Sequence, residues 1–388
     1  MAGLVSRGFT CGICPNYGMG GGTFTLDGYT VHPQGGGLSI PETIETYRRH
    51  NYDVLVSLFD VWVMGQMADL VRKNRVTWCP YIPLDVTALP HSLGQILGAA
   101  TYIIPFCKYG ADMLRRAGFE NVWKNGIYHG VDADVYKPLN RPKEEMRKWL
   151  GFQDKTFVIG DFKMNKGDRV KIGENLEAVK IFLENNPDLA NEVGIYLHTS
   201  SAAPQGTDLR QVTKSLGLEG YVRFVEPYAY FQGFTEEQMA RAYNACDCVL
   251  NVVSSGGFEI PIIESMSCGV PVIATGVEVM KELLDPVTPE LEVKPSAEYW
   301  TPIPSKQYQP DVYDIADKLE TVLNADPEHY KQKLVPYVRK NFDWDVIIEE
   351  WNDFFEFLPS YIADKCLEIP TKTSKYLKKL AKGVVKTK

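Results

Sequence analysis

A glycine turn that leads into a short helix is the segment best suited to bind a phosphorylated sugar. After an apolar run that ends at Val253, the chain reads Ser-Ser-Gly-Gly-Phe-Glu-Ile-Pro-Ile-Ile-Glu264. Proline suits a first helical turn because its missing N–H costs nothing there. We therefore expect a helix that starts near Pro261, carries Glu264 in its first turn and ends at Gly269. The free N–H groups and dipole of such a helix attract phosphate, although an acidic first turn also stabilises a helix that has no ligand.

A basic segment after another predicted strand suits the same ligand. The strand 157–162 is followed by Lys163-Met-Asn-Lys-Gly-Asp-Arg169-Val-Lys171, and a helical pattern begins at Ile172. Cations at the mouth of a strand–helix turn can bind a diphosphate and stabilise it as it departs. The alternative is a basic turn that is merely solvated.

Carboxylates stand at two further places. The segment Trp78-Cys-Pro-Tyr-Ile-Pro-Leu-Asp85 ends a buried strand with an acid that could orient an acceptor hydroxyl or cap the next turn. Asp132 and Asp134 have the Asp-x-Asp spacing of a metal site, but they fall in a turn between domains, and we treat the match as coincidental. We expect His129 to structure the same turn rather than to catalyse.

The stretch around Glu264 resembles the signature of family-4 retaining glycosyltransferases, usually Glu-Gly-Phe-Gly-x-Pro-x-x-Glu-Ala-Met-Ala-Cys-Gly-x-Pro-Val. The residues that match in register are Gly257, Phe258, Pro261, Glu264, Met266, Cys268, Gly269, Pro271 and Val272. The resemblance implies that Glu264 binds the ribose of the donor nucleotide. It also implies that the turn Gly257, Phe258, Glu259 and Ile260 approaches the donor's sugar and phosphates.

The signature departs from the family at two positions. Gly256 stands where the family has its first Glu, and Glu259 stands where it has its second Gly. Either the acidic group has moved along the loop, so that Glu259 reaches the sugar, or the site has lost a contact.

Four weaker matches extend the resemblance over nearly the whole chain. Arg169 falls on the Arg of a family Arg-Lys pair and Lys171 comes one position late, while Asp85 ends a variant of a first-domain motif. These matches imply catalytic roles for Arg169, Lys171 and Asp85. The segments Tyr128–Pro138 and Phe342–Trp351 resemble the end of the family's first domain and its closing helix.

Short apolar runs alternate with helical patterns, which predicts parallel sheets covered by helices. The predicted strands are 9–14, 53–59, 76–82, 101–106, 156–162, 193–198, 222–225, 248–253 and 270–274. The resemblance implies an α/β fold of the GT-B type, in which two Rossmann-like domains face each other across a cleft. We expect an acceptor-side domain at 1–140 that lacks the family's first strand, a nucleotide-sugar domain at 141–344, a crossing helix at 345–370 and a basic tail at 371–388. The polar stretch 298–311 is expected to form a surface loop.

The composition excludes several functions. The 388 residues carry a formal net charge of −8, which makes nucleic acid an unlikely partner. No apolar run is long enough for a membrane span, and the N-terminus lacks the pattern of a secretory signal. The scattered cysteines, including Cys11 and Cys14, are expected to be free thiols, which favours a cytoplasmic location. The tail 371–388 carries seven lysines and no acid, and it is either a solvated end or a peripheral contact with the inner face of a membrane.

The function that the resemblance implies is transfer of a hexose from a UDP- or GDP-linked donor to a hydroxyl of a glycan or lipid-linked acceptor, with retention of configuration. No cofactor and no metal is expected, because Arg169 and Lys171 would replace the ion. The alternative is a non-catalytic subunit that binds a nucleotide sugar or a partner glycosyltransferase, and Gly256 and the short N-terminus motivate it.

Overall fold

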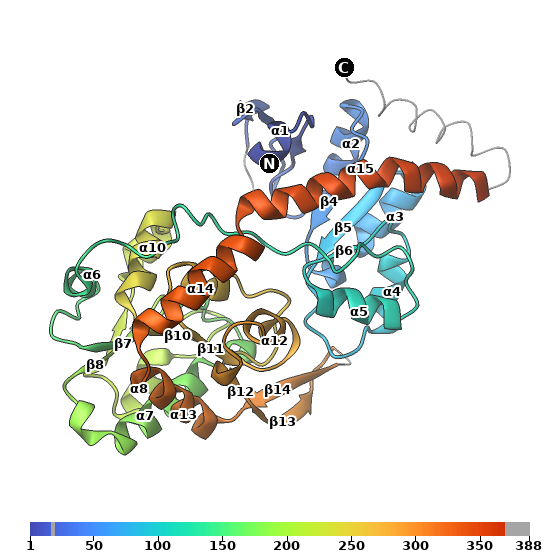
Figure 1. Cartoon of the computed structure of the whole chain (residues 1–388). Coiled ribbons are helices and arrows are strands. Elements are labelled where there is room, and N and C mark those ends of the chain that lie inside the picture. Colours follow the sequence, from blue (N-terminus) through green and yellow to red (C-terminus); the bar gives the residue numbers. More distant parts are fainter. Residues whose placement is uncertain (17–19, 304, 369–388) are drawn as a thin grey trace.

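A six-stranded parallel sheet forms the larger half of the molecule. In the computed structural model, which describes residues 1–16, 20–303 and 305–368, its strand order is β12-β11-β10-β7-β8-β9 (Figure 1). The strands are β7 (Phe157–Asp161), β8 (Val193–Leu197), β9 (Val222–Phe224), β10 (Cys248–Asn251), β11 (Val272–Thr275) and β12 (Glu292–Val293). Every residue of β7, β8, β10 and β11 is buried, which explains why these strands appear in the sequence as continuous apolar runs.

Helices cover this sheet. They are α6 (Lys143–Trp149), α7 (Ile172–Asn185), α8 (Leu209–Leu216), α9 (Pro227–Gln232), α10 (Glu236–Ala245), α11 (Ile260–Ser267), α12 (Glu278–Leu284), α13 (Val312–Leu323) and α14 (Pro327–Asn341). Ile172, Leu176 and Val179 recur on one face of α7 and are buried in the same cluster as the strands. The sequence prediction of parallel sheets packed with helices is confirmed.

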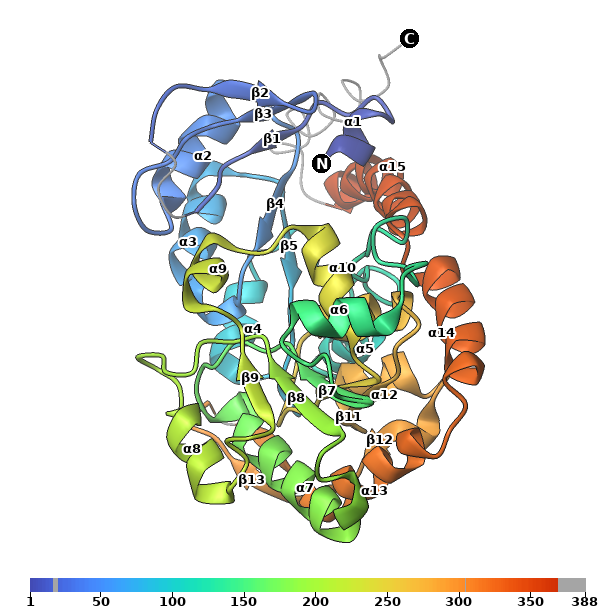
Figure 2. The same ribbon diagram turned by 90° about the vertical axis from the view of Figure 1, so that its left-hand side faces the viewer.

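A three-stranded parallel sheet forms the core of the other half, in the order β4-β5-β6 (Figure 1). Figure 2 shows β4 and β5 from a second direction. Its elements are α2 (Ile40–Arg49), β4 (Leu55–Leu58), the 3-10 turn η1 (Val61–Val63), α3 (Gly65–Asn74), β5 (Trp78–Ile82), α4 (His91–Leu97), β6 (Ile104–Pro105) and α5 (Lys108–Arg116). The long helix α15 (Trp344–Glu368) crosses to this sheet, where Phe354 and Leu358 are buried with Tyr81 and Ile104. No helix in the described part of the chain is both long and apolar enough to cross a membrane.

Two predictions about secondary structure were wrong. The strand expected at 9–14 is only β1 (Gly12–Ile13), and it belongs to a small separate sheet with β2 (Phe24–Leu26) and β3 (Tyr29–Val31) after α1 (Ala2–Val5). The surface loop expected at 298–311 is mostly the antiparallel hairpin of β13 (Pro295–Trp300) and β14 (Lys306–Pro310). Neither strand of the hairpin has a continuous buried face, so its hydrophobic pattern is too weak to identify it.

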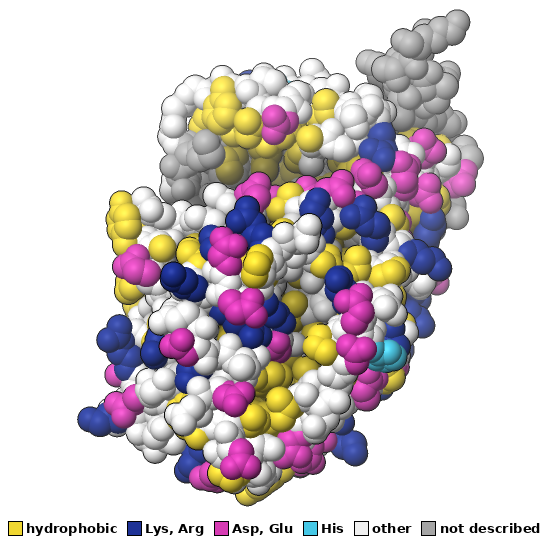
Figure 3. Space-filling model, turned by 60° about the vertical axis from the view of Figure 1, so that its left-hand side comes forward, with side chains coloured by type: hydrophobic (Ala, Val, Ile, Leu, Met, Phe, Trp, Pro, Cys, Tyr) yellow, Lys and Arg dark blue, Asp and Glu magenta, His cyan; other side chains and the backbone are white. Residues whose placement is uncertain are grey.

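The basic tail 371–388 lies outside the described residues. On the face drawn in Figure 3, basic and acidic side chains stand close together over the body of the molecule.

Candidate active site at the junction of the two sheets

The carboxyl ends of strands from both sheets meet at one junction. Ser255, in the turn after β10, has Oγ 2.7 Å from the backbone oxygen of Asp85, in the loop after β5, and 2.8 Å from Oε2 of Glu278, so its one hydroxyl proton is shared between these two acceptors. A Cβ placed on Gly257 would lie 2.3 Å from Cβ of Pro83, so only glycine permits this close approach. Ligands of parallel α/β sheets bind beyond the carboxyl ends of the strands, and the predicted site residues lie in this region.

Arg169 joins the basic segment to the glycine turn. It lies in the 3-10 turn η2 (Asp168–Val170) after β7, which pairs with β10. Its Nη1 donates to the backbone oxygen of Ser255 at 2.7 Å and to the carboxylate of Glu259 at 3.2 Å. The side chain stays 40% exposed, so the guanidinium keeps donors free for an anion.

Glu259 occupies the space that a side chain at position 256 would fill. A Cβ on Gly256 would lie 2.4 Å from Oε1 of Glu259. The Glu259 side chain is 11% exposed, and its other oxygen accepts a hydrogen bond from Asn251 at 3.4 Å. Burial raises the pKa of this carboxyl, and Arg169 opposes that rise. The side chain of Glu259 thus fills the space that the glycine at position 256 leaves open, so the two departures from the family signature compensate each other within one turn.

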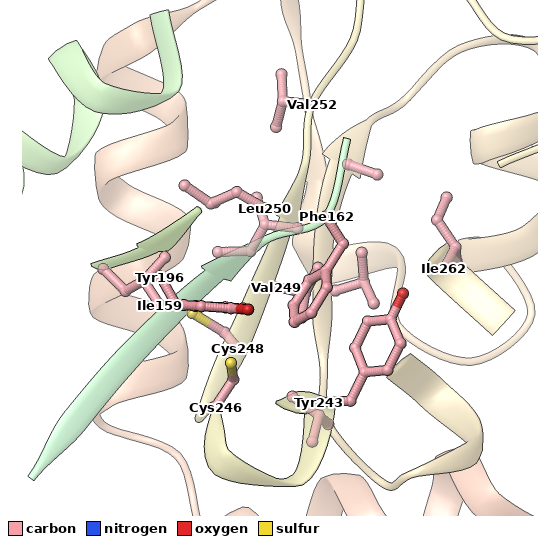
Figure 4. Packing of buried hydrophobic residues seen from close by; sticks show 14 of the residues in the cluster. Ile159, Phe162, Tyr196, Tyr243, Cys246, Cys248, Val249, Leu250, Val252 and Ile262 are labelled. Atoms are coloured by element: carbon pink, nitrogen blue, oxygen red, sulfur yellow. The ribbon is translucent and has the colours of Figure 1, made fainter. Parts of the chain in front are cut away.

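Glu264 lies one turn farther into α11 than expected. The helix starts at Ile260, one residue before the proline, so Glu264 falls in the second turn and not the first. Its carboxylate accepts a hydrogen bond from the hydroxyl of Tyr243 at 2.7 Å. The Tyr243 ring packs on Phe162, with 4.1 Å between centroids (Figure 4). Burial raises the pKa of Glu264, against hydrogen bonds from Tyr243 and Tyr136 that lower it.

Lys171 is turned away from Arg169 and Glu259. It adopts a left-handed backbone (φ 49°) directly before α7, and its ammonium pairs with Asp168 at 3.1 Å and Glu174 at 3.3 Å. The ring of Tyr299, on the β13–β14 hairpin, lies 5.2 Å from Nζ. Burial lowers the pKa of Lys171, but the two carboxylates outweigh it and leave the pKa raised. The structure therefore does not bring the two predicted cations together.

The other predicted residues of the turn contribute backbone and packing. The ring of Phe258 lies 5.0 Å from His129, and burial lowers the pKa of that histidine to about 4. Ile260 begins α11 and is 40% exposed.

Asp132 and Asp134 do not form a metal site with each other. Asp132 accepts backbone hydrogen bonds within its own turn, and Asp134 pairs with Arg339. Within the described residues, no group of three or more His, Cys, Asp or Glu side chains could hold a metal ion.

Three charged residues at the junction were not singled out from the sequence. Lys163 is buried and donates to Asp161 at 2.7 Å and to the Leu250 oxygen at 2.9 Å. Asp60 follows β4 and does not cap η1, and its pKa is raised by desolvation and by Asp85. Glu278, at the start of α12, accepts hydrogen bonds from Ser255 and Gly256. Asp60 and Glu278 stand outside every motif in the sequence, and Lys163 opens the basic segment but nothing in the sequence distinguishes it from the other cations there.

Known proteins resemble parts of this chain. Residues 170–300 match the model of the family Glycosyl transferases group 1. The D-inositol 3-phosphate glycosyltransferase of Corynebacterium aurimucosum is 28% identical over 203 residues, which are 51% of this chain and 42% of that protein. The enzyme of the same name from Corynebacterium diphtheriae is 29% identical over 155 residues, or 39% and 34% of the two chains. The chain thus spans less than half the length of the curated relatives it matches.

Solved structures resemble the whole molecule. Sucrose-phosphate synthase from Thermosynechococcus elongatus superimposes with a TM-score of 0.69 at 17% identity and covers 92% of this chain and 91% of that one. Anabaena HepE in complex with UDP-glucose gives a TM-score of 0.64 at 18% identity, over 84% and 85% of the two chains. The protein therefore has the GT-B fold, and its residues 170–300 are similar to the glycosyl transferases group 1.

Proposed function

We propose that the protein is a hexosyltransferase that takes a sugar from a UDP- or GDP-linked donor. The observation that carries this proposal is the position of Arg169, which holds the turn between β10 and α11 while its guanidinium stays partly exposed. A cation beside a helix N-terminus suits a diphosphate. The names of the curated relatives and the UDP-glucose bound to Anabaena HepE support the same ligand class.

The proposed reaction assigns one task to each side of the junction. Arg169 and the backbone N–H groups of Gly257 to Ile260 bind the diphosphate and stabilise its charge as the bond to the sugar breaks. Glu259 reaches the sugar in place of the glutamate missing at 256, and Glu264 binds the ribose through the face that Tyr243 leaves free. Asp85 orients the acceptor hydroxyl, which belongs to a glycan or a lipid-linked sugar.

We propose that configuration is retained and that no metal takes part. The acceptor attacks from the face that the diphosphate leaves, and a departing phosphate oxygen takes its proton. The positive charge that a metal would supply comes from Arg169, with Lys163 buried behind it. We propose for Lys171 only that it orders the start of α7, since both of its partners are carboxylates of its own segment.

We place the reaction in the cytoplasm. Seven cysteines are free thiols, which suits a reducing compartment: Cys11, Cys14, Cys79, Cys107, Cys246, Cys248 and Cys268. A contact of the tail 371–388 with the inner face of a membrane is part of the same proposal and rests on its seven lysines.

The second candidate is a subunit that binds nucleotide sugar without turnover. The observation that favours it is the ion pair of Arg169 with Glu259. In this pair Glu259 already neutralises part of the guanidinium charge that a diphosphate would need. A screen of UDP- and GDP-sugars separates the two candidates when it measures both binding by calorimetry and release of UDP or GDP, with and without sugar acceptors. Release that persists in excess EDTA supports the transferase, and binding without release supports the subunit. A strict requirement for Mn²⁺ or Mg²⁺ would contradict the metal-free mechanism.

A further inference from the structure

Glu278 is a buried carboxylate in which one oxygen is hydrogen-bonded and the other is not. Its Oε2 accepts a hydrogen bond from the Gly256 N–H at 3.0 Å, and it lies 2.8 Å from Ser255 Oγ, whose one proton it shares with the backbone oxygen of Asp85. Its Oε1 is buried and has no hydrogen-bond partner among the described residues. The residue is 7% exposed and adopts φ 51°, a left-handed conformation that side chains rarely take. Such a strained and half-satisfied group is expected to serve a function.

The groups that face Glu278 come from both halves of the molecule. They are Asp85 after β5, Cys107 and Tyr109 at the start of α5, Arg169 in η2 and Tyr308 on β14. Burial raises the pKa values of Cys107, Tyr109 and Tyr308, so these three stay neutral near pH 7. Burial raises the pKa of Glu278 to about 7 with a smaller contribution from Asp85, while the hydrogen bonds from Ser255 and Gly256 and the charge of Arg169 oppose the rise. Glu278 can therefore change its protonation state near neutral pH.

Arg169 and Glu278 hold Ser255 from two sides. Arg169 donates to the backbone oxygen of Ser255 at 2.7 Å, and the hydroxyl of Ser255 donates to Glu278 at 2.8 Å. An anion bound to Arg169 would therefore lie near the Glu278 carboxylate, where burial leaves their repulsion little screened by salt. Such an anion would repel the carboxylate and weaken the attraction that Arg169 supplies.

We propose that Glu278 takes up a proton from solvent when a nucleotide-diphosphate sugar binds to Arg169 and the turn at 254–257. The proton goes to Oε1, while Oε2 continues to accept from Ser255 and Gly256, so the turn keeps its shape as the repelling charge disappears. This inference rests on the proposed function of the site. It makes donor binding depend on pH through a residue that the family signature does not contain.

Calorimetry of the whole protein with UDP-glucose and with GDP-mannose tests the coupling. A sugar-linked diphosphate releases no proton near neutral pH, and His129 and His198, whose pKa values are lowered to about 4, stay neutral as well. Binding at about pH 7.5 in two buffers of different ionisation enthalpy should show uptake of about half a proton, if the bound ligand raises the Glu278 pKa by about one unit. By linkage, the Kd should then weaken about six-fold between pH 6.5 and pH 8.5.

The variant Glu278→Gln separates this role from a structural one. The amide keeps an oxygen for Ser255 and Gly256 but carries no charge, so proton uptake should vanish and the Kd should no longer depend on pH. At pH 8.5 the variant should bind the nucleotide sugar about five- to ten-fold more tightly than the wild type, whereas loss of a purely structural contact would weaken binding. Glu350→Gln removes an exposed carboxyl on α15 whose pKa is also raised by desolvation, and it should behave as the wild type.

Two results would overturn the proposal while the proposed function stands. One is binding of either nucleotide sugar to the wild type without proton uptake, a measurement that does not require the variant to fold. The other is uptake that persists in Glu278→Gln. If neither nucleotide sugar binds at all, the proposed function fails, and the proton coupling fails with it.

Discussion

The two parallel sheets turn their carboxyl edges to the same junction, and the charged side chains at those edges differ. The edge of the six-stranded sheet carries Arg169, which donates to the glycine turn, and Lys163, which donates to the backbone oxygen of Leu250 on β10. The edge of the three-stranded sheet brings Asp60 and Asp85, which follow the paired strands β4 and β5. Cations suit the anionic part of a donor, and carboxylates suit the hydroxyls of an acceptor. The contrast predicts that variants at one edge change donor binding, while variants at the other change turnover alone.

The largest effect is expected from Arg169→Ala. The variant loses a hydrogen bond to Ser255 and leaves Glu259 without its cation, so kcat/KM should fall by at least about 100-fold, or roughly 3 kcal/mol. Binding of UDP-glucose by calorimetry should weaken in parallel. Arg210→Ala, in which an exposed arginine on α8 is removed, is the control and should bind normally. Unchanged donor affinity in Arg169→Ala would remove the six-stranded edge from the donor site.

Asp85→Asn tests the opposite edge. Loss of the carboxylate that orients the acceptor should lower kcat by about 10- to 100-fold, with the donor Kd within about two-fold of the wild type. Steady-state rates at saturating donor, together with calorimetry, measure the two effects separately. Asp112→Asn on α5, which removes an exposed partner of Arg115, controls for charge alone. A parallel loss of donor affinity would show that the two edges do not divide the work.

The strands of the two edges could be predicted from the sequence far better than the charged side chains that meet at the junction. Strands such as β7 and β10 are buried along their whole length and appear as apolar runs, and the motif around Glu264 stands in one stretch of chain. Asp60 and Glu278 belong to no motif, and what makes them notable is burial and neighbours from distant segments. The direction of the Lys171 side chain could not be predicted either, because it depends on a hairpin that lies more than a hundred residues away.

Glu264→Ala asks whether the second turn of α11 reaches the donor. If Glu264 binds the ribose, nucleotide binding should weaken by about 1–3 kcal/mol, the cost of losing a charge-assisted hydrogen bond. Tyr243→Phe removes only the hydroxyl that now donates to Glu264 and should change the Kd much less. Calorimetry with UDP and GDP measures both variants. Equal affinities for Glu264→Ala and the wild type would mean that Glu264 serves only its tyrosine partner.

The exchange of volume between positions 256 and 259 can be reversed. Gly256→Glu alone places a side chain where Glu259 Oε1 now lies, 2.4 Å from the new Cβ, so donor affinity should fall by about ten-fold from overpacking. The double variant Gly256→Glu with Glu259→Gly restores the order of the family signature and should recover most of that loss. A double variant no better than the single one would show that Glu259 does not act in place of a glutamate at 256.

The smallest effect is expected from Lys171→Met, although the sequence suggests a catalytic cation there. The Met side chain can fill the space beside Tyr299, and the two carboxylates that lose their partner, Asp168 and Glu174, are 78% and 24% exposed and can be hydrated. The free energy of unfolding should therefore fall by only about 1 kcal/mol, and the donor Kd should stay within about two-fold. Thermal denaturation and calorimetry measure the two quantities. A loss of donor affinity as large as that of Arg169→Ala would show that Lys171 reaches the diphosphate after all, which would require the β13–β14 hairpin to move and would place both cations of the basic segment at the donor edge.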